Sequence, residues 1–204
     1  MQAQIAPSGL TLRGVATRAL EVPLTFTLGT SAAVVRAVPL LLVDVSTEQG
    51  VVGRAYLFCY TRAGARAVAL LIAEAVELVK GQAVHPQAVQ QALLRRFALL
   101  GVAGPVRMAL SALDIALWDA VGIAAGLPLT DLLGAERRPI RAYDSRGLGL
   151  MAPARLAGEA EALLRKGMRA LKLRLGCPER NKQASVMQTD RDTVRVRAIS
   201  RIVD

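Results

Sequence analysis

The order of strand-like and helical segments changes near residue 139, and this change restricts the chain to a two-part architecture. Strand-like segments come first and helical segments follow them, whereas beyond the charged linker Ala135–Pro139 the two kinds of segment alternate. Strands grouped ahead of helices are typical of an α+β domain, and alternation is typical of parallel βα units. We therefore predict two domains, 1–138 and 139–204.

The first domain is predicted to begin with a three-stranded antiparallel meander. The strands are expected over Leu10–Val22, Arg36–Ser46 and Val51–Tyr60, where β-branched and aliphatic residues are concentrated. A short polar turn that ends in Gly50 joins the last two strands as a hairpin. The segment Pro23–Val35 is rich in small residues, and we expect it to form a long flexible loop that carries function.

A helical bundle is predicted to complete this domain. Apolar periodicity indicates helices over Ala63–Lys80, Pro86–Leu100 and Val106–Ala125. The last of these is apolar almost all round, so we expect it to lie buried between other elements. His85, the chain's one histidine, precedes a proline in the first turn, and this position indicates a helix start rather than a catalytic group.

The second domain is predicted to contain two βα units. Strands are expected over Ile140–Tyr143 and Arg169–Leu175, and helices over Ala152–Lys166 and Thr189–Val203. Two such units make only the opening part of a (β/α) barrel. We expect this part of the chain to pack on a partner or to exchange with another chain, because its strands leave backbone groups unpaired.

Composition excludes several classes of protein. A hydrophobic content of 53% is enough for a folded core, which excludes a disordered chain. The sequence predicts no membrane span, and Met1–Leu12 lacks the pattern of a secretory signal. Cys59 and Cys177 lie far apart without metal-site spacing, so we expect a reducing, cytoplasmic environment.

The formal charge of +10, from 26 Lys and Arg against 16 Asp and Glu, raises the alternative of nucleic-acid binding. Aromatic residues for base stacking are scarce (Phe 3, Tyr 3, Trp 1), and no basic run is interleaved with them. We therefore expect neither a nucleic-acid nor a membrane partner. The charge is also compatible with an anionic substrate or with solvated helix faces.

A basic pair, Lys172 and Arg174, lies on the second predicted strand of the barrel part. Because side chains alternate along a strand, both are expected to point to one face while the neighbouring leucines point to the other. On an exposed edge such a pair is only solvated, but inside a covered parallel sheet it needs an anionic ligand or carboxylates. Ser145 follows the first strand of this part, where barrel sites form, and either binds a substrate or belongs to a turn with Asp144.

One long segment carries a family signature. It is Ala109–Gly122, with the sequence ALSALDIALWDAVG, and Pro128–Gly134 follows it. The two together resemble the first signature of the mandelate racemase/muconate lactonizing enzyme family, which is part of the enolase superfamily. Further similarity to that family extends over Val22–Leu24, Gly50–Gly53, Tyr56–Thr61, Arg107–Met108, Ala142–Ser145 and Ala170–Gly176.

The resemblance implies a fold and a chemistry. The fold is an α+β capping domain, made of the three-stranded meander and a helical bundle, followed by a (β/α) barrel of which this chain holds the first two βα units. In this family Mg²⁺ binds the substrate carboxylate while a base removes the proton α to it. The resemblance also implies that Pro23–Val35 and Ala55–Tyr60 close over the site, with Tyr60 packing on the substrate.

Lys172 and Arg174 occupy the positions of the family's Lys-x-Lys motif, in which the first lysine contacts the carboxylate and the second acts as a base. Arg174 departs from this pattern. A guanidinium keeps its proton near neutral pH, so it binds an oxyanion well but serves poorly as a base. Two-base racemisation is therefore disfavoured, whereas dehydration with a base elsewhere is compatible with the sequence.

The function implied by the resemblance is metal-assisted removal of the proton α to a carboxylate, in the racemisation or dehydration of a 2-hydroxy or sugar acid. The family's metal carboxylates and its His–Asp base have no counterparts in the 204 residues, so we predict no metal ligand here and expect the chain alone to be inactive. We expect a small carboxylate substrate and either a homo-oligomer or a companion chain. The alternative is a non-catalytic remnant that oligomerises or binds a partner.

Overall fold

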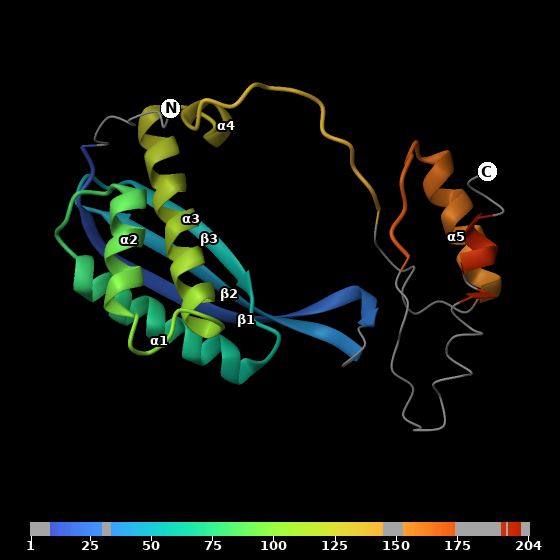
Figure 1. Cartoon of the computed structure of the whole chain (residues 1–204), viewed down its shortest axis with the longest axis horizontal. Coiled ribbons are helices and arrows are strands. Elements are labelled where there is room, and N and C mark those ends of the chain that lie inside the picture. The colour runs from blue at the N-terminus through green and yellow to red at the C-terminus, as the bar shows by residue number, and fades with distance from the viewer. Residues whose placement is uncertain (1–8, 30–33, 145–152, 174–192, 195, 201–204) are drawn as a thin grey trace. The chain divides into compact units, whose positions relative to one another are not determined.

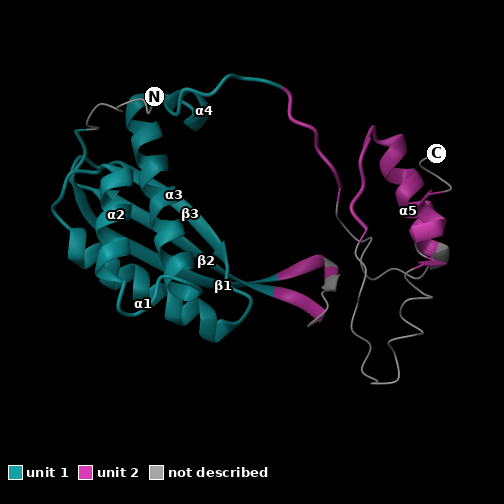
Figure 2. Cartoon of the chain, in the orientation of Figure 1, with its two compact units in different colours: residues 1–22, 38–138 teal, residues 23–37, 139–204 magenta. Residues whose placement is uncertain are grey.

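The computed structural model describes residues 9–29, 34–144, 153–173, 193–194 and 196–200 (Figure 1). The chain forms two compact units, one of residues 1–22 with 38–138 and the other of residues 23–37 with 139–204 (Figure 2). Because the second unit also takes in residues 23–37, the division into domains at residue 138 stays a prediction.

A three-stranded sheet of order β1-β2-β3 forms the first layer of the first unit, although the end of β1 and the start of β2 belong to residues 23–37 of the second. Its strands are β1 (Leu12–Gly29), β2 (Val34–Thr47) and β3 (Val52–Phe58). β2 pairs antiparallel with β3, in a register that runs from Leu40 opposite Phe58 to Ser46 opposite Val52. The predicted meander is confirmed.

The sequence predicts a flexible loop over Pro23–Val35, and for most of this segment the prediction is wrong. β1 continues to Gly29 and β2 begins at Val34. Two threonines in this stretch favour a strand, and Pro23 is tolerated because β1 lies at the edge of the sheet, where one side of the strand needs no hydrogen bonds. Residues 30–33 lie outside the described part of the chain.

Helices lie in the first unit where the sequence predicts them, with small shifts at their ends. The sheet is followed by α1 (Arg62–Val79), α2 (Pro86–Arg96), α3 (Pro105–Ala125) and α4 (Leu129–Leu132). Thr61 caps α1, because its hydroxyl accepts a hydrogen bond from the Gly64 amide at 2.9 Å. His85 caps α2 through its ring Nδ1, which accepts from the Ala88 amide at 3.4 Å, so its predicted place at a helix start is confirmed.

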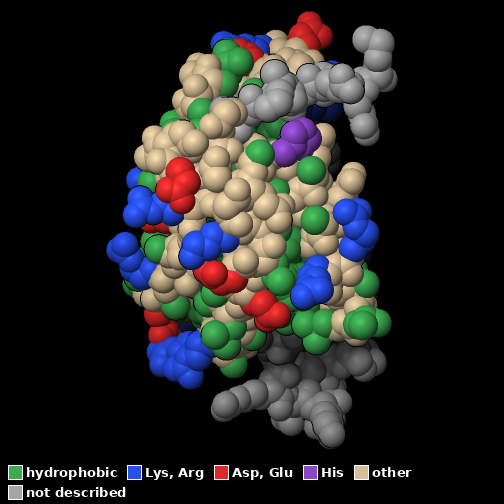
Figure 3. All heavy atoms as spheres, turned by 90° about the vertical axis from the view of Figure 1, so that its left-hand side faces the viewer, with side chains coloured by type: hydrophobic (Ala, Val, Ile, Leu, Met, Phe, Trp, Pro, Cys, Tyr) green, Lys and Arg blue, Asp and Glu red, His purple; other side chains and the backbone are tan. Residues whose placement is uncertain are grey.

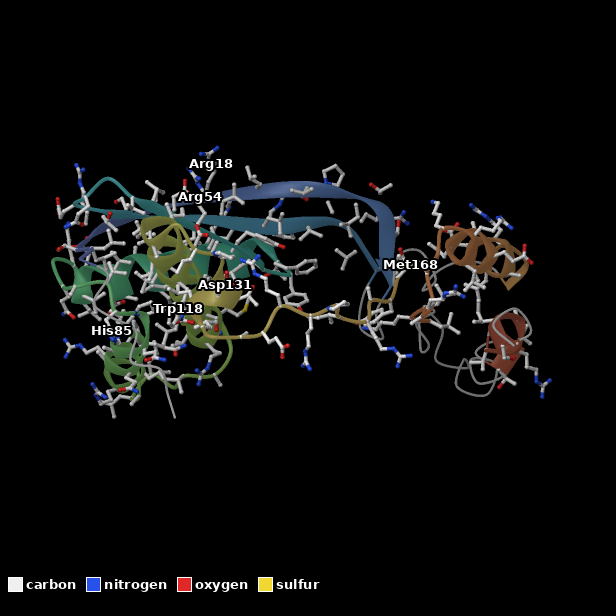
Figure 4. All side chains as sticks on the ribbon, turned by 90° about the horizontal axis from the view of Figure 1, so that it is seen from above. Arg18, Arg54, His85, Trp118, Asp131 and Met168 are labelled. Atoms are coloured by element: carbon white, nitrogen blue, oxygen red, sulfur yellow. The ribbon has the colours of Figure 1, made fainter. Side chains whose placement is uncertain are left out.

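The core of the first unit lies between the sheet and the helices, which cover one face of the sheet (Figure 1). Arg18 and Arg54 project from the other face (Figure 4). Full burial of an aliphatic side chain stabilises a fold by about 1.5–3 kcal/mol, so this layer dominates the stability of the unit. Its most buried members include Leu41, Val43 and Val45 of β2, Val68, Ile72 and Val76 of α1, and Leu110, Leu113 and Leu117 of α3.

β3 and α3 approach each other closely because Gly53 has no side chain. A Cβ atom at this position would lie 2.0 Å from the carbonyl oxygen of Ala116 and 2.6 Å from the amide nitrogen of Ala120. Beside this contact, the Asp119 carboxylate accepts a hydrogen bond from the Arg54 amide at 2.8 Å. β3 is an edge strand, so Asp119 satisfies an amide that no further strand can reach.

By length and composition, α3 is the one described helix that is apolar enough to cross a membrane. In the folded unit it is a core helix, since half of its most apolar window is buried and it packs against β3, α1 and α2. Ile115 and Ile123 are each 52% exposed. The prediction that α3 lies buried between other elements is therefore wrong for the side that carries these two residues.

Parallel βα structure begins in the described residues beyond 139. Asp144 and Leu171 form a parallel bridge on either side of α5 (Pro153–Arg165) in the sequence. The Asp144 amide donates to the Ala170 carbonyl at 3.1 Å, and the Lys172 amide donates to the Asp144 carbonyl at 2.8 Å. Among the described residues, the predicted strands Ile140–Tyr143 and Arg169–Leu175 are represented only by this isolated bridge, whereas the helix between them lies where the sequence predicts it.

A small separate core accompanies this pairing. Leu156 and Leu163 of α5 are fully buried, and the apolar residues packed against them are Met168, Leu171, Leu173 and Ile199. Residues 193–194 and 196–200 are helical, within the predicted helix Thr189–Val203. The second unit therefore has a core of its own, which is small as far as its described residues show.

Candidate active site

Lys172 is the described member of the predicted basic pair, and it lies between Leu171 and Leu173, which pack against the buried leucines of α5. Tyr143 precedes Asp144, the residue that bridges to Leu171. The Lys172 Nζ lies 5.6 Å from the centroid of the Tyr143 ring, a cation–π distance.

Ser145 and Arg174, the other residues predicted in this part of the site, lie outside the described residues. Their position beside Lys172 and their roles therefore stay predictions. Sequence reasoning singled out Lys172 but missed Tyr143 as its neighbour. Finding this contact requires the alternation of side chains along both predicted strands and the register in which the two pair. The register cannot be read from either segment alone.

Tyr60, predicted to contact the substrate, lies in the first unit at a sharp corner between β3 and α1. Its backbone φ of 58° falls in the left-handed region, which residues other than glycine seldom occupy. The side chain is 70% exposed, and its ring meets the Phe58 ring edge to face with centroids 4.6 Å apart. Strained and exposed residues of this kind cluster at ligand sites, so the geometry keeps Tyr60 among the candidates.

The corner is held by the neighbours of Tyr60. Pro39 accepts a hydrogen bond from the Cys59 amide at 2.9 Å, but as a proline it has no amide proton to return to the Cys59 carbonyl. That carbonyl accepts instead from the Thr61 amide at 2.6 Å, which turns the chain away from the sheet. A Cβ atom at Gly64 would lie 2.8 Å from the Cys59 oxygen, so a glycine is needed where α1 passes the corner.

Two titratable groups of the first unit are shifted by burial alone. Desolvation raises the pKa of the Cys59 thiol, so the thiol stays protonated and is a poor nucleophile. Desolvation also raises the pKa of the Asp114 carboxyl on α3, which has no hydrogen-bond or ion-pair partner among the described residues. These shifts follow from packing and do not mark a catalytic pair.

A metal site is not assembled by the described part of the chain. No group of three or more His, Cys, Asp or Glu side chains within it is placed to hold a metal ion. Mg²⁺ prefers several oxygen ligands, usually carboxylates and waters. The described residues therefore do not fit the metal by themselves.

Comparison with known proteins settles the family. Residues 12–134, more than half of the chain, match the N-terminal domain of the mandelate racemase / muconate lactonizing enzyme family. The chain belongs to this family. The resemblance stated from the sequence is confirmed, and the three-stranded sheet with its helices is the capping domain that the resemblance implied.

Three relatives show the range of proteins to which the chain is similar. A 3,6-anhydro-alpha-L-galactonate cycloisomerase of Streptomyces coelicolor is 32% identical over 143 residues, which are 69% of this chain and 39% of the cycloisomerase. An L-talarate/galactarate dehydratase of Salmonella typhimurium is 38% identical over 87 residues, which are 42% of this chain and 22% of the dehydratase. The crystal structure of a Bradyrhizobium enolase complexed with magnesium and mandelic acid is 34% identical with a TM-score of 0.80, over 96% of this chain and 51% of that protein.

The chain spans about half the length of this solved structure and 39% of the cycloisomerase. The matched part consists of the capping domain and the opening of the barrel. Magnesium is present in the Bradyrhizobium enolase and in a racemase from Streptomyces coelicolor, so Mg²⁺ as the cofactor of related proteins is confirmed.

Proposed function

We propose that this chain is the N-terminal part of an enzyme that removes the proton α to the carboxylate of a small 2-hydroxy or sugar acid. The observation that carries the proposal is the place of Lys172, which stands at the family's lysine motif between two leucines that pack against α5, with its Nζ 5.6 Å from the Tyr143 ring. Mandelic acid in the Bradyrhizobium relative, and the acids named for the cycloisomerase and the dehydratase, support the substrate class.

Each predicted site residue has a role in this proposal. The Lys172 ammonium binds the substrate carboxylate through a charge-assisted hydrogen bond. Arg174 binds an oxyanion with its paired N–H groups, and the Ser145 hydroxyl donates a further hydrogen bond. Tyr60 packs on the apolar part of the substrate, with Phe58 supporting its ring.

Dehydration fits this sequence better than two-base racemisation. Arg174 stands where the family has a basic lysine, and a guanidinium does not release its proton near neutral pH. An enzyme that removes the α-proton with a single base elsewhere does not need a base at position 174, so arginine at this position does not impair its reaction. The similarity to the L-talarate/galactarate dehydratase supports the same reaction class.

We propose further that the 204 residues are inactive without additional barrel residues, supplied by a longer polypeptide, a second copy or a companion chain. Mg²⁺, when bound in a complete site of this family, stabilises the negative charge that develops on the substrate. The cytoplasm is the proposed compartment, because the two cysteines are not spaced as a disulfide framework.

A non-catalytic role in oligomerisation or partner binding is the second candidate. The end of α3 and the α4 segment carry apolar side chains that are each 45–52% exposed: Ile123, Leu127, Leu129 and Leu133. Exposed apolar groups that occur together favour coverage by another protein surface. This candidate predicts a defined assembly without binding of a carboxylate at Lys172.

The test measures carboxylate binding and proton exchange separately. Mandelate is titrated into the chain labelled with ¹³C-lysine, and we expect the Lys172 resonance to shift while the matched variant Lys80→Met leaves that shift unchanged. Lys172→Met should abolish the response. If mandelate leaves the Lys172 resonance unmoved, the proposed site is wrong, and the result favours a non-catalytic role in oligomerisation or partner binding.

Proton exchange then tests the expected inactivity. Mandelate and galactarate are incubated with the chain and Mg²⁺ in deuterated buffer, and the α-proton signal is followed by NMR. We expect no exchange above the buffer rate from the 204 residues alone. Catalysed exchange would show that the chain, or an oligomer of it, forms a complete site.

A further inference from the structure

We propose that Tyr143 is a positioning residue for Lys172, which holds the ammonium group so that it meets an incoming carboxylate. This inference rests on the proposed function and adds a residue that the family signature does not assign. Tyr143 is 57% exposed, and its ring lies 5.6 Å from the Lys172 Nζ. A cation at this distance from a ring face is attracted by the negative face of the π system.

Backbone pairing fixes the two side chains as neighbours. Two backbone hydrogen bonds set the register of the two parallel segments. The Asp144 amide donates to the Ala170 carbonyl at 3.1 Å, and the Asp144 carbonyl accepts from the Lys172 amide at 2.8 Å. Leu171, opposite Asp144, packs on the buried leucines of α5. A slip by one residue would turn Leu171 away from that core and Lys172 toward it, so burial of the leucine secures the Tyr143–Lys172 contact.

The aromatic contact changes what Lys172 can do. A lysine side chain is long and flexible, so most of its rotamers do not place the ammonium where a carboxylate arrives. The Tyr143 ring favours the rotamers that bring Nζ over its face, and the N–H groups turned away from the ring stay free to donate. Only the ring face is needed for this, so the phenolic hydroxyl of Tyr143 is dispensable.

The test uses the full chain labelled with ¹³C-lysine. The chain has lysines only at 80, 166, 172 and 182, so the spectrum is simple, and Lys172→Arg assigns the Lys172 resonance. The ring current of Tyr143 should place the Lys172 side-chain protons upfield of those of the other lysines. Tyr143→Phe should preserve this position, and Tyr143→Leu should remove it.

Mandelate titration then measures the positioning effect. We expect Tyr143→Leu to weaken the binding that Lys172 reports by about two- to fivefold, the range of an exposed cation–π contact, and Tyr143→Phe to bind as the unmodified chain does. Tyr56→Leu is the matched control, because Tyr56 is also exposed, at 67%, but lies on β3 of the other unit.

The outcomes separate this inference from the proposed function. If Lys172 responds to mandelate equally in the unmodified chain and in Tyr143→Leu, the positioning role is wrong while the carboxylate site stands. If mandelate does not shift the Lys172 resonance in the unmodified chain, the proposed site and the positioning role are both wrong. A loss of the upfield shift and of affinity in Tyr143→Leu, with rescue in Tyr143→Phe, supports the inference.

Discussion

The two units of the chain differ in how much apolar surface they bury. In the first unit, β2, α1 and α3 share a continuous core whose central side chains are almost fully inaccessible. In the second, the described core is a cluster around Leu156 and Leu163. Stability grows with buried apolar area, so the first unit resembles a self-sufficient domain, whereas the described residues of the second bury much less. Of the predicted site residues, Tyr60 lies on the first unit and Lys172 on the second.

The largest change in the free energy of unfolding is expected from a substitution at Gly53, where β3 and α3 are packed closely. In Gly53→Ala the added methyl group would lie 2.0 Å from the Ala116 carbonyl oxygen, so β3 and α3 must separate. Overpacking against backbone atoms is expected to lower the free energy of unfolding of this unit by about 3 kcal/mol. Urea denaturation, followed by the fluorescence of Trp118 on α3, measures the change.

Gly14→Ala is the control for this experiment. A Cβ atom at Gly14 meets only the Ser46 Oγ at 3.8 Å, an ordinary contact, so its effect should be small. If the two variants unfold at the same urea concentration, the close approach of β3 to α3 does not limit the stability of the first unit.

A truncation in the second unit tests whether the units are independent. Leu163→Ala removes a side chain that is 1% exposed from a small cluster, and we expect a local loss of about 2 kcal/mol or more. Amide hydrogen exchange should then show that protection is lost around α5 and retained in the first unit. Leu164→Ala, at the neighbouring and partly buried position, is the control. Equal loss of protection in both units would contradict their independence.

The sequence predicts the first unit well because its signals are local. Alternating apolar residues, capping residues and the polar turn before Val51 each act within a few positions, and the strands and helices lie where these signals place them. For Pro23–Val35 the sequence predicts a loop wrongly, because Pro23 and small residues indicate a loop unless the strand is known to lie at an edge. Edge position is a property of the assembled sheet.

The candidate site shows the same limit. Alternation along one strand predicts that Lys172 points away from the leucines, and Leu171 and Leu173 do pack together against α5. Its contact with Tyr143 depends on the register of two segments that are separated by α5. The left-handed backbone of Tyr60 depends on Pro39, which lies on another strand, and on the space at Gly64. Contacts of this kind are set by tertiary packing and leave no local pattern.

A smaller effect is expected from relieving the strain at Tyr60. Glycine adopts a positive φ without the steric cost that a side chain incurs, although it also loses more entropy on folding. We expect Tyr60→Gly to be about 0.5–1 kcal/mol more stable to unfolding than Tyr60→Ala, which keeps the strain and lacks the ring. Thermal unfolding of the two variants measures the difference. Equal stability would show that the corner stores no backbone strain.

The smallest effect concerns Asp114 and depends on pH. Burial raises the pKa of this carboxyl above its ordinary value of 3.8, so the folded chain binds the proton more tightly than the unfolded chain does. Below pH 3.8 this carboxyl therefore makes its full contribution to the free energy of unfolding. That contribution is lost as the pH rises through the folded-state pKa. At neutral pH the ionised carboxylate opposes folding.

Asp114→Asn removes the ionisation while keeping the shape of the side chain. The variant should be more stable than the unmodified chain at neutral pH, and this gain should shrink as the pH falls through the folded-state pKa toward 3.8, because below 3.8 the unmodified carboxyl is protonated in both states. Urea denaturation at a series of pH values measures the gain. Asp44→Asn is a suitable control, since the Asp44 side chain is 44% exposed and paired with Arg54. A gain that is independent of pH would mean that Asp114 acts through packing rather than through its charge.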